Sequence, residues 1–353
     1  MVGTYYLNFI PYRIAWHIYK LLHKRELNIV HVESDFDYFL FRNIAKYLSS
    51  LEIAVTDRKL IGQIKQIAPK STIFHVYPFC YPDSVVMFRN AAWKYPVRRI
   101  IKIGLEHGAY NFKRFPKPYY YNLFDLYMMT SFQDVDRLQS LGVTTVKSVG
   151  YPKSDSLFDG SYTQSMLNSL RTKLGLNPNK STVLFSSTWD GSGMSAIAKW
   201  YNRLDSLVSK YNILVTLHPR MSERYYKFLQ QVIGIHFIND MDVYPYLLIA
   251  DVCIGDTNSL IAEFCIVNKP IITFSIESTV RTMDDVIGLI TDISIRIDSF
   301  DQVEPAIEQA IRTAQETAST RQNVIRTFIN PLDGKAGWRA AQEIIRLIPK
   351  LKP

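Results

Sequence analysis

The chain has 353 residues, of which 47% are hydrophobic and 21% are charged. This is the composition of a globular protein, so a disordered chain is excluded, and the length suits two α/β domains better than one small core. Lys and Arg number 41 against 32 Asp and Glu, and the net charge of +9 favours an anionic partner, such as a phosphorylated substrate, nucleic acid or an acidic lipid surface.

The stretch at residues 5–25 predicts an amphipathic helix that begins after Pro11. Aliphatic residues recur on one stripe, aromatic residues flank it and basic residues supply charge. In that order they are Ile14, Ile18, Leu21 and Leu22; Trp16 and Tyr19; and Arg13, Lys20, Lys24 and Arg25. Such a helix either lies in a membrane interface or packs on its own domain, which is the commoner outcome. No apolar run approaches the ~20 residues of a membrane span, and we recognise no signal peptide.

Strands and helices alternate along the rest of the chain. Strands are predicted at residues 28–32, 53–55, 72–76, 98–105, 126–129, 146–149, 182–186, 212–217, 236–237, 252–254 and 271–274. Helices are predicted at residues 34–47, 57–68, 85–92, 132–141, 161–174, 195–210, 224–233, 260–267, 303–317 and 338–347. This alternation indicates an α/β protein with two Rossmann-like domains, whose parallel sheets face a central cleft. We expect an N-terminal domain at 1–155, a C-terminal domain at 156–335 and a closing helix at 336–353.

The segment at residues 252–274 is a predicted βαβ unit with a polar turn at its centre. The turn Gly255-Asp256-Thr257-Asn258-Ser259 lies between a buried strand and a helix. Backbone amides and a helix dipole at such a turn favour an anion, typically a phosphate, and the side chains add donors. Glu263, farther along the helix, can meet hydroxyl groups of a ligand or face solvent. The alternative is an N-cap cluster that binds nothing.

Two further polar loops follow predicted strands and should meet at the same cleft. In Glu106-His107-Gly108, the histidine suits a general base for a hydroxyl nucleophile, although a loop histidine that binds a carbonyl is the simpler interpretation. In His218-Pro219-Arg220, the His and Arg side chains can both donate to phosphate oxygens; the alternative is a surface loop with one ion pair.

Hydroxyl groups also gather after the strand at 182–186, at Ser187 and Thr188. There is no GxGxxG, GxxxxGK or GxSxG motif, and no cluster has metal-ligand spacing, so we expect neither a cofactor nor a metal. The three cysteines lack CxxC spacing, which indicates a reducing compartment.

Taken together, the loops resemble the CDP-glycerol glycerophosphotransferases, the teichoic-acid polymerases and primases of bacterial envelopes. The resemblance rests on six segments in order and on the tail at residues 331–336. The segments are 106–108, 150–155, 186–189, 218–219, 250–251 and 256–259. Glu106 and Ala109 stand where that family has Trp and Thr.

The resemblance implies a GT-B fold, a CDP-linked phosphopolyol donor and work at the cytoplasmic membrane face. It implies that His107 is the base and that His218 and residues 256–259 lie near the donor phosphates. Lys153 stands where the family usually has Arg, so it joins the substrate-binding candidates. The expected acceptor is lipid-linked or a glycan, an anionic membrane surface is a further partner, and no nucleic acid is expected. Two alternatives stay open: a GT-B glycosyltransferase that uses a nucleotide sugar, and a non-catalytic membrane-bound scaffold.

Overall fold

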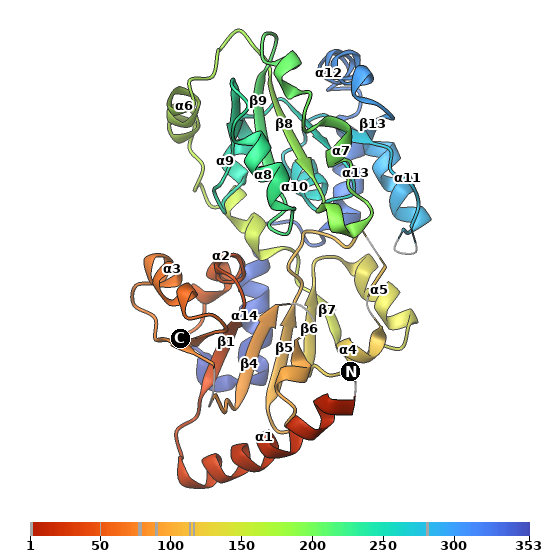
Figure 1. Cartoon of the computed structure of the whole chain (residues 1–353). Helices are drawn as coiled ribbons and strands as arrows, with labels where there is room; N and C mark the ends of the chain where they lie inside the picture. Colours follow the sequence, from red (N-terminus) through yellow and green to blue (C-terminus); the bar gives the residue numbers. More distant parts are fainter. Residues whose placement is uncertain are drawn as a thin grey trace. The chain divides into compact units, whose positions relative to one another are not determined.

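The structure is a computed structural model that describes residues 3–49, 51–76, 80–88, 91–112, 114–115, 117–279 and 282–353, with side chains from residue 9 onward. The chain forms two compact units (Figure 1). Unit 1 comprises residues 1–108, 115–158 and 330–353, and unit 2 comprises residues 109–114 and 159–329. The C-terminal segment therefore folds with unit 1. No helix among the described residues is long and apolar enough to cross a bilayer.

Unit 1 is built on a parallel sheet of seven strands in the order β3-β2-β1-β4-β5-β6-β7. The strands are β1 (Asn28–Val32), β2 (Glu52–Val55), β3 (Ile73–His75), β4 (Ser84–Phe88), β5 (Ile101–Leu105), β6 (Leu126–Met129) and β7 (Val146–Ser148). β1 pairs in parallel with both β2 and β4. The central strands β1, β4 and β5 are mostly apolar and almost wholly buried, because both faces of a parallel sheet are covered.

The helix predicted at residues 85–92 is wrong, because its first half is the central strand β4. All five residues of Ser84–Phe88 are buried, so the strand lacks the alternation of apolar and polar residues that marks a half-exposed strand. A short, fully apolar run does not distinguish a buried strand from a buried helix.

Helices of unit 1 surround this sheet, and the last of them comes from the C-terminus of the chain. They are α1 (Gly3–Leu22), α2 (Asp35–Ala45), α3 (Lys59–Ile67), α4 (Pro118–Tyr121), α5 (Phe132–Ser140) and α14 (Ala336–Leu347). α14 packs against α2 and the 3₁₀ helix η2 (Pro152–Leu157). A Cβ at Gly337 would lie 2.4 Å from the Asn43 carbonyl oxygen, so only glycine permits this close approach.

Unit 2 holds a parallel sheet of six strands in the order β10-β9-β8-β11-β12-β13. The strands are β8 (Thr182–Ser187), β9 (Asn212–Leu217), β10 (Ile235–Phe237), β11 (Val252–Gly255), β12 (Ile271–Phe274) and β13 (Ser294–Ile297). The helices are α6 (Gln164–Lys173), α7 (Ile197–Trp200), α8 (Glu223–Leu229), α9 (Tyr244–Ile249), α10 (Leu260–Ile266), α11 (Asp284–Ile293), α12 (Val303–Arg312) and α13 (Ala318–Phe328). β13, α9, α11 and α13 were not predicted.

Two long helices predicted for unit 2 are wrong. Residues 195–210 form α7 and a separate 3₁₀ turn, Leu204–Leu207, and residues 303–317 form α12 only as far as Arg312. The side chains of Trp200, Leu204 and Leu207 all join the core beside β8 and β9. Packing of these apolar groups onto the sheet therefore outweighs the helical propensity of the sequence between them.

Candidate functional site

Three polar loops of unit 2 lie at one edge of its sheet. They follow β8, β9 and β11, which are neighbours in the order β9-β8-β11. Because the strands are parallel, their carboxyl ends meet at the same edge, where α/β proteins bind ligands. The structure thus brings together the loops that carry Ser187 and Thr188, His218 and Arg220, and residues 256–259.

Asp256 is the organising group of this edge. It is fully buried, and its carboxylate accepts a hydrogen bond from the Ser187 hydroxyl. It also accepts bonds from the backbone amides of Thr188 at 2.9 Å, Ala196 at 2.9 Å and Thr257 at 2.6 Å. Burial raises the pKa of Asp256, although these hydrogen bonds oppose the shift. The carboxylate therefore ties the loop after β8 to the loop after β11.

The rest of the polar turn is also largely buried. The Thr257 hydroxyl donates to the Met194 carbonyl at 3.4 Å, and the Asn258 amide donates to the Ser186 hydroxyl at 3.2 Å. The Asn258 Oδ1 atom is buried and has no hydrogen-bond partner in the described structure. Ser259 occupies the N-cap position of α10 without a side-chain cap. The Ser259 side chain therefore does not cap α10.

The loop after β9 presents His218 in a defined tautomer. The His218 Nδ1 atom accepts a hydrogen bond from the Arg220 backbone amide at 3.0 Å. In a neutral imidazole only one ring nitrogen carries a proton, so the proton lies on Nε2, which becomes a donor. The Arg220 side chain is exposed. The loop therefore offers an N–H donor and a guanidinium, which suit phosphate oxygens.

Asp190 connects this loop to the loop after β8. Its carboxylate accepts hydrogen bonds from the Ser222 amide at 3.0 Å and the Ser222 hydroxyl at 2.5 Å. Burial raises the pKa of Asp190, but the bonds from Ser222 outweigh that effect and hold the pKa below its ordinary value. This link joins residues 32 positions apart, and no local pattern in the sequence signals it.

In unit 1, Glu106 and His107 follow β5, and their side chains lie in close contact. The Glu106 Oε1 atom lies 3.0 Å from the His107 Nδ1 atom and also accepts the His107 backbone amide at 3.0 Å. The Glu106 side chain is 6% exposed and the His107 side chain is 48% exposed. A carboxylate only accepts, so its position beside Nδ1 favours the tautomer with the proton on Nδ1 and the lone pair on Nε2. The arrangement suits a general base.

Two other candidates are buried. Lys153 lies in η2, and its ammonium group is 5.8 Å from the centre of the Phe36 ring. Glu263 lies within α10 and is 4% exposed, so it is not a solvent-facing helix residue. No group of three or more His, Cys, Asp or Glu side chains in the described ranges is arranged to hold a metal ion.

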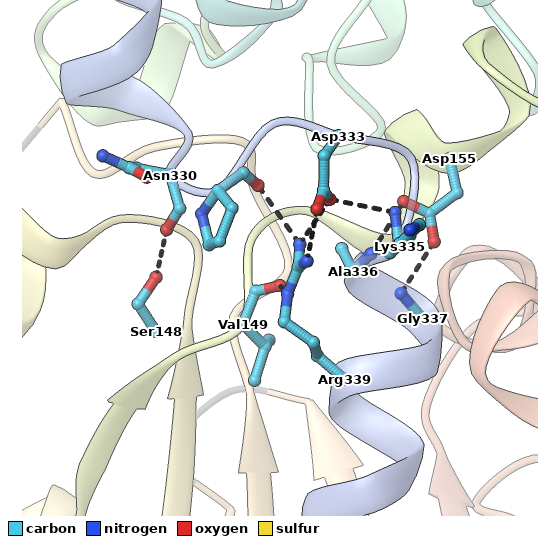
Figure 2. Close-up of polar contacts among 10 residues, drawn as sticks. Ser148, Val149, Asp155, Asn330, Asp333, Lys335, Ala336, Gly337 and Arg339 are labelled. Atoms are coloured by element: carbon cyan, nitrogen blue, oxygen red, sulfur yellow. Dashed lines mark hydrogen bonds and ion pairs between the residues drawn. The ribbon is translucent and has the colours of Figure 1, made fainter.

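The segments at 150–155 and 331–336 meet in unit 1, which the sequence did not reveal (Figure 2). The Asp155 carboxylate accepts the backbone amides of Ala336 at 3.0 Å and Gly337 at 2.7 Å, at the start of α14. Arg339 donates to the Val149 carbonyl at 2.9 Å and forms a two-bond ion pair with Asp333. These segments therefore fasten the returning chain to β7 and η2.

Comparison with known proteins agrees with this architecture. The family model of CDP-Glycerol:Poly(glycerophosphate) glycerophosphotransferase matches residues 131–348. The teichoic acid poly(ribitol-phosphate) polymerase of Bacillus spizizenii is 24% identical over 93% of this chain and 53% of its own length. The teichoic acid ribitol-phosphate polymerase TarL of Staphylococcus aureus is 28% identical over 39% of this chain and 26% of its own. The chain thus spans about half the length, or less, of these curated relatives.

Solved structures confirm the fold class. The wall teichoic acid polymerase TagF matches with a TM-score of 0.68 at 15% identity, over 99% of this chain and 98% of that one. The Staphylococcus aureus MnaA–UDP structure matches with a TM-score of 0.62 at 16% identity, over 93% and 99%. The fold is therefore α/β of the GT-B type, as predicted. The resemblance seen in the motifs is confirmed as well: this chain belongs to the CDP-glycerol:poly(glycerophosphate) glycerophosphotransferase family.

Proposed function

We propose that this protein transfers a phosphopolyol from a CDP-linked donor to a hydroxyl group of an envelope polymer. Family membership supports the reaction class. The relatives are named for ribitol phosphate and for glycerol phosphate, so both are candidate cargoes. The acceptor oxygen attacks the phosphorus that bears the polyol, a new P–O bond forms, and the bond to CMP breaks.

The observation that carries the proposal is the different group beside the Nδ1 atom of each histidine, an acceptor at His107 and a donor at His218. The His107 Nδ1 atom faces a carboxylate, which leaves Nε2 free to accept a proton. The His218 Nδ1 atom accepts a backbone amide, which makes Nε2 a donor. One histidine is thus prepared to take the proton of the acceptor hydroxyl, and the other to neutralise charge on the donor phosphates.

The donor site in this proposal is the carboxyl edge of unit 2. His218 and Arg220 donate to diphosphate oxygens, and phosphoryl transfer depends mainly on such positioning and charge stabilisation. Ser187 and Asp256 act chiefly on the shape of the edge, because their side chains already bond to each other, and the backbone amide of Thr188 bonds to the same carboxylate. Asn258, with an unpaired buried oxygen, is the member of the turn with capacity to bind a donor hydroxyl.

The finer parts of the proposal concern the acceptor and the location. We place the acceptor on a lipid-linked or glycan chain at the cytoplasmic face of the membrane. The net charge of +9 supports attraction to an anionic surface.

The test is to identify the nucleotide that is released. The chain is incubated with CDP-glycerol, CDP-ribitol, or UDP- and GDP-sugars, each with a lipid-linked polyol-phosphate acceptor, and the nucleotides are separated by chromatography. We expect CMP from one CDP-polyol and growth of the acceptor. Release of UDP or GDP with sugar transfer, and no CMP, would replace the proposal with the glycosyltransferase alternative.

A further inference from the structure

Four polar side chains of unit 1 form a cluster at the carboxyl end of β1. His31 lies in β1, Glu33 follows that strand, and Lys94 and Tyr95 lie at the end of the 3₁₀ helix η1 (Ala92–Lys94). The Lys94 ammonium contacts the Glu33 carboxylate, and the His31 Nδ1 atom lies 2.7 Å from the Tyr95 hydroxyl oxygen. The cluster joins residues 61 to 64 positions apart in the chain, which no local sequence pattern signals.

The inner half of the cluster is buried and points toward Glu33. His31 is 2% exposed, and burial raises the pKa of the Tyr95 hydroxyl, so this hydroxyl keeps its proton and can donate it to Nδ1. The His31 Nε2 atom then carries a proton and lies 3.4 Å from the Glu33 Oε1 atom. Nε2 is buried and has no hydrogen-bond partner among the described residues. A buried donor in this condition lowers the stability of the fold.

The outer half of the cluster reaches solvent. The Glu33 and Lys94 side chains are 28% and 30% exposed. The contacts with His31 and Lys94 outweigh burial and hold the pKa of Glu33 below its ordinary range, so its carboxylate is an acceptor at neutral pH. An ammonium has three protons, of which Glu33 takes one, so Lys94 keeps donors for a ligand. A partly exposed ion pair adds little stability, so stability does not explain a histidine buried behind it.

The cluster lies at the same edge of the sheet as the proposed base. β4 lies between β1 and β5, and the strand register places residues 31, 87 and 104 in one row (Figure 1). Glu33 and Glu106 are each two residues beyond that row, so they lie level with each other. Two strand spacings separate them, roughly 10 Å between their backbones. The part of an acceptor next to a hydroxyl at His107 is therefore within reach of Glu33 and Lys94.

We propose that Glu33 and Lys94 bind the terminal polyol phosphate unit of the acceptor beside the base. Glu33 accepts hydrogen bonds from hydroxyl groups of the last polyol, and Lys94 binds the phosphate that joins this polyol to the chain. His31, which contacts Tyr95, supports Glu33 from the buried side. The inference deepens the proposed function and rests on it for the identity of the acceptor.

The test is calorimetric titration of the full chain, without donor, with short synthetic oligomers of glycerol phosphate or of ribitol phosphate. We expect the wild type to bind at least one of them. Lys94→Gln should weaken this binding by at least about tenfold, because a charge-assisted hydrogen bond is lost. Lys94→Arg keeps the charge and should retain most of the affinity. Glu33→Asp keeps the charge but withdraws the carboxylate by one methylene group, so it should also weaken binding.

The matched control is Lys147→Gln, which breaks the ion pair of another lysine of unit 1 with Glu343. It should bind the oligomer as the wild type does. The proposal is overturned if Lys94→Gln binds the oligomer like the wild type, whether or not its melting temperature falls. It is also overturned if the wild type binds neither oligomer, or if Lys147→Gln loses as much affinity as Lys94→Gln.

The binding assay contains no donor, so its outcome is separate from the release of CMP. CMP release by the wild type, with oligomer affinity unchanged in Lys94→Gln, would contradict this inference alone. Loss of oligomer affinity in Lys94→Gln, with no CMP release by the wild type, would contradict the proposed transfer and leave the binding site in place. In the complete reaction, Lys94→Gln should raise the acceptor KM and leave the affinity for CDP unchanged.

Discussion

The substitution Asp256→Asn tests whether Asp256 organises the donor edge or contacts ligand. In the wild type, both carboxylate oxygens accept hydrogen bonds, from the Ser187 hydroxyl and from the amides of Thr188, Ala196 and Thr257. Asparagine keeps one acceptor and replaces the other with a donor. If the NH₂ group takes the place of Oδ2, it faces the Ala196 N–H. This N–H and an N–H of the new amide are then both buried without an acceptor.

The magnitude follows from the groups left unpaired. Each buried donor without a partner costs about 1–3 kcal/mol, so two cost about 2–6 kcal/mol. The Ser187 hydroxyl can turn to accept, and loss of the buried charge is favourable because burial already raises the pKa of Asp256. We therefore expect a net loss of about 2–4 kcal/mol in the free energy of unfolding. At about 2–4 °C per kcal/mol for a unit of this size, the melting temperature falls by about 4–16 °C.

The assay is differential scanning calorimetry together with titration of CDP. The control is Asp251→Asn, because Asp251 precedes the same strand, β11, and accepts one backbone amide, that of Thr182, at 2.8 Å while it is exposed. The control should shift the melting temperature much less. If Asp256→Asn melts as the wild type does but no longer binds CDP, Asp256 is a ligand group and the reasoning fails.

Three further predictions concern single residues. His107→Ala should lower turnover by about 10²–10⁴-fold and leave the affinity for CDP unchanged. His107→Gln should not restore turnover, because an amide does not accept the proton. Single-turnover kinetics in the presence of acceptor measures both variants, and near-wild-type turnover in His107→Ala would remove the base from the mechanism. His218→Ala should weaken CDP binding by about 1–3 kcal/mol and leave cytidine binding unchanged. The control His236→Ala, on the edge strand β10, should change neither affinity. If calorimetric titration shows that His218→Ala loses the same affinity for cytidine as for CDP, the phosphate contact is contradicted. Arg339 holds the pKa of Asp333 below its ordinary 3.8, so their bond stabilises the fold above that pH. The melting temperature of Asp333→Asn should lie below that of the wild type at neutral pH, and the two should converge as the pH falls below 3.8. A difference in melting temperature that does not depend on pH would refute the charge argument.

Local sequence patterns were sufficient to predict most strands and the polar loops that follow them. Parallel strands carry an apolar signal within a few residues, so β1, β6, β9, β11 and β12 were predicted nearly as they are. The polar loops that follow β5, β8, β9 and β11 were also recognisable, because carboxyl ends of parallel strands place them at one edge of each sheet. The assignment of β4 failed because a short buried run has no periodicity that distinguishes strand from helix.

Contacts between distant residues decided the hydrogen bonds of individual side chains. Asp256 looked like a ligand group because its loop is polar, but its partners Ser187 and Ala196 lie about seventy and sixty positions earlier in the chain and occupy its oxygens. The tautomers of His107 and His218 likewise depend on one neighbouring group each, the Glu106 carboxylate and the Arg220 backbone amide. Hydrogen-bond geometry of this kind has no signature in composition or spacing.

The N-terminal helix separates the two kinds of information most clearly. The sequence by itself determined that α1 is amphipathic, basic and both aliphatic and aromatic, because helical periodicity is a local property. Only the tertiary structure decided which apolar face is buried: the loop before β4 offers carbonyl oxygens to Trp16 and Tyr12, and bulky amphipathic rings fill that surface. The aliphatic side chains, which have no polar group to pair there, are left on the outer face of the helix.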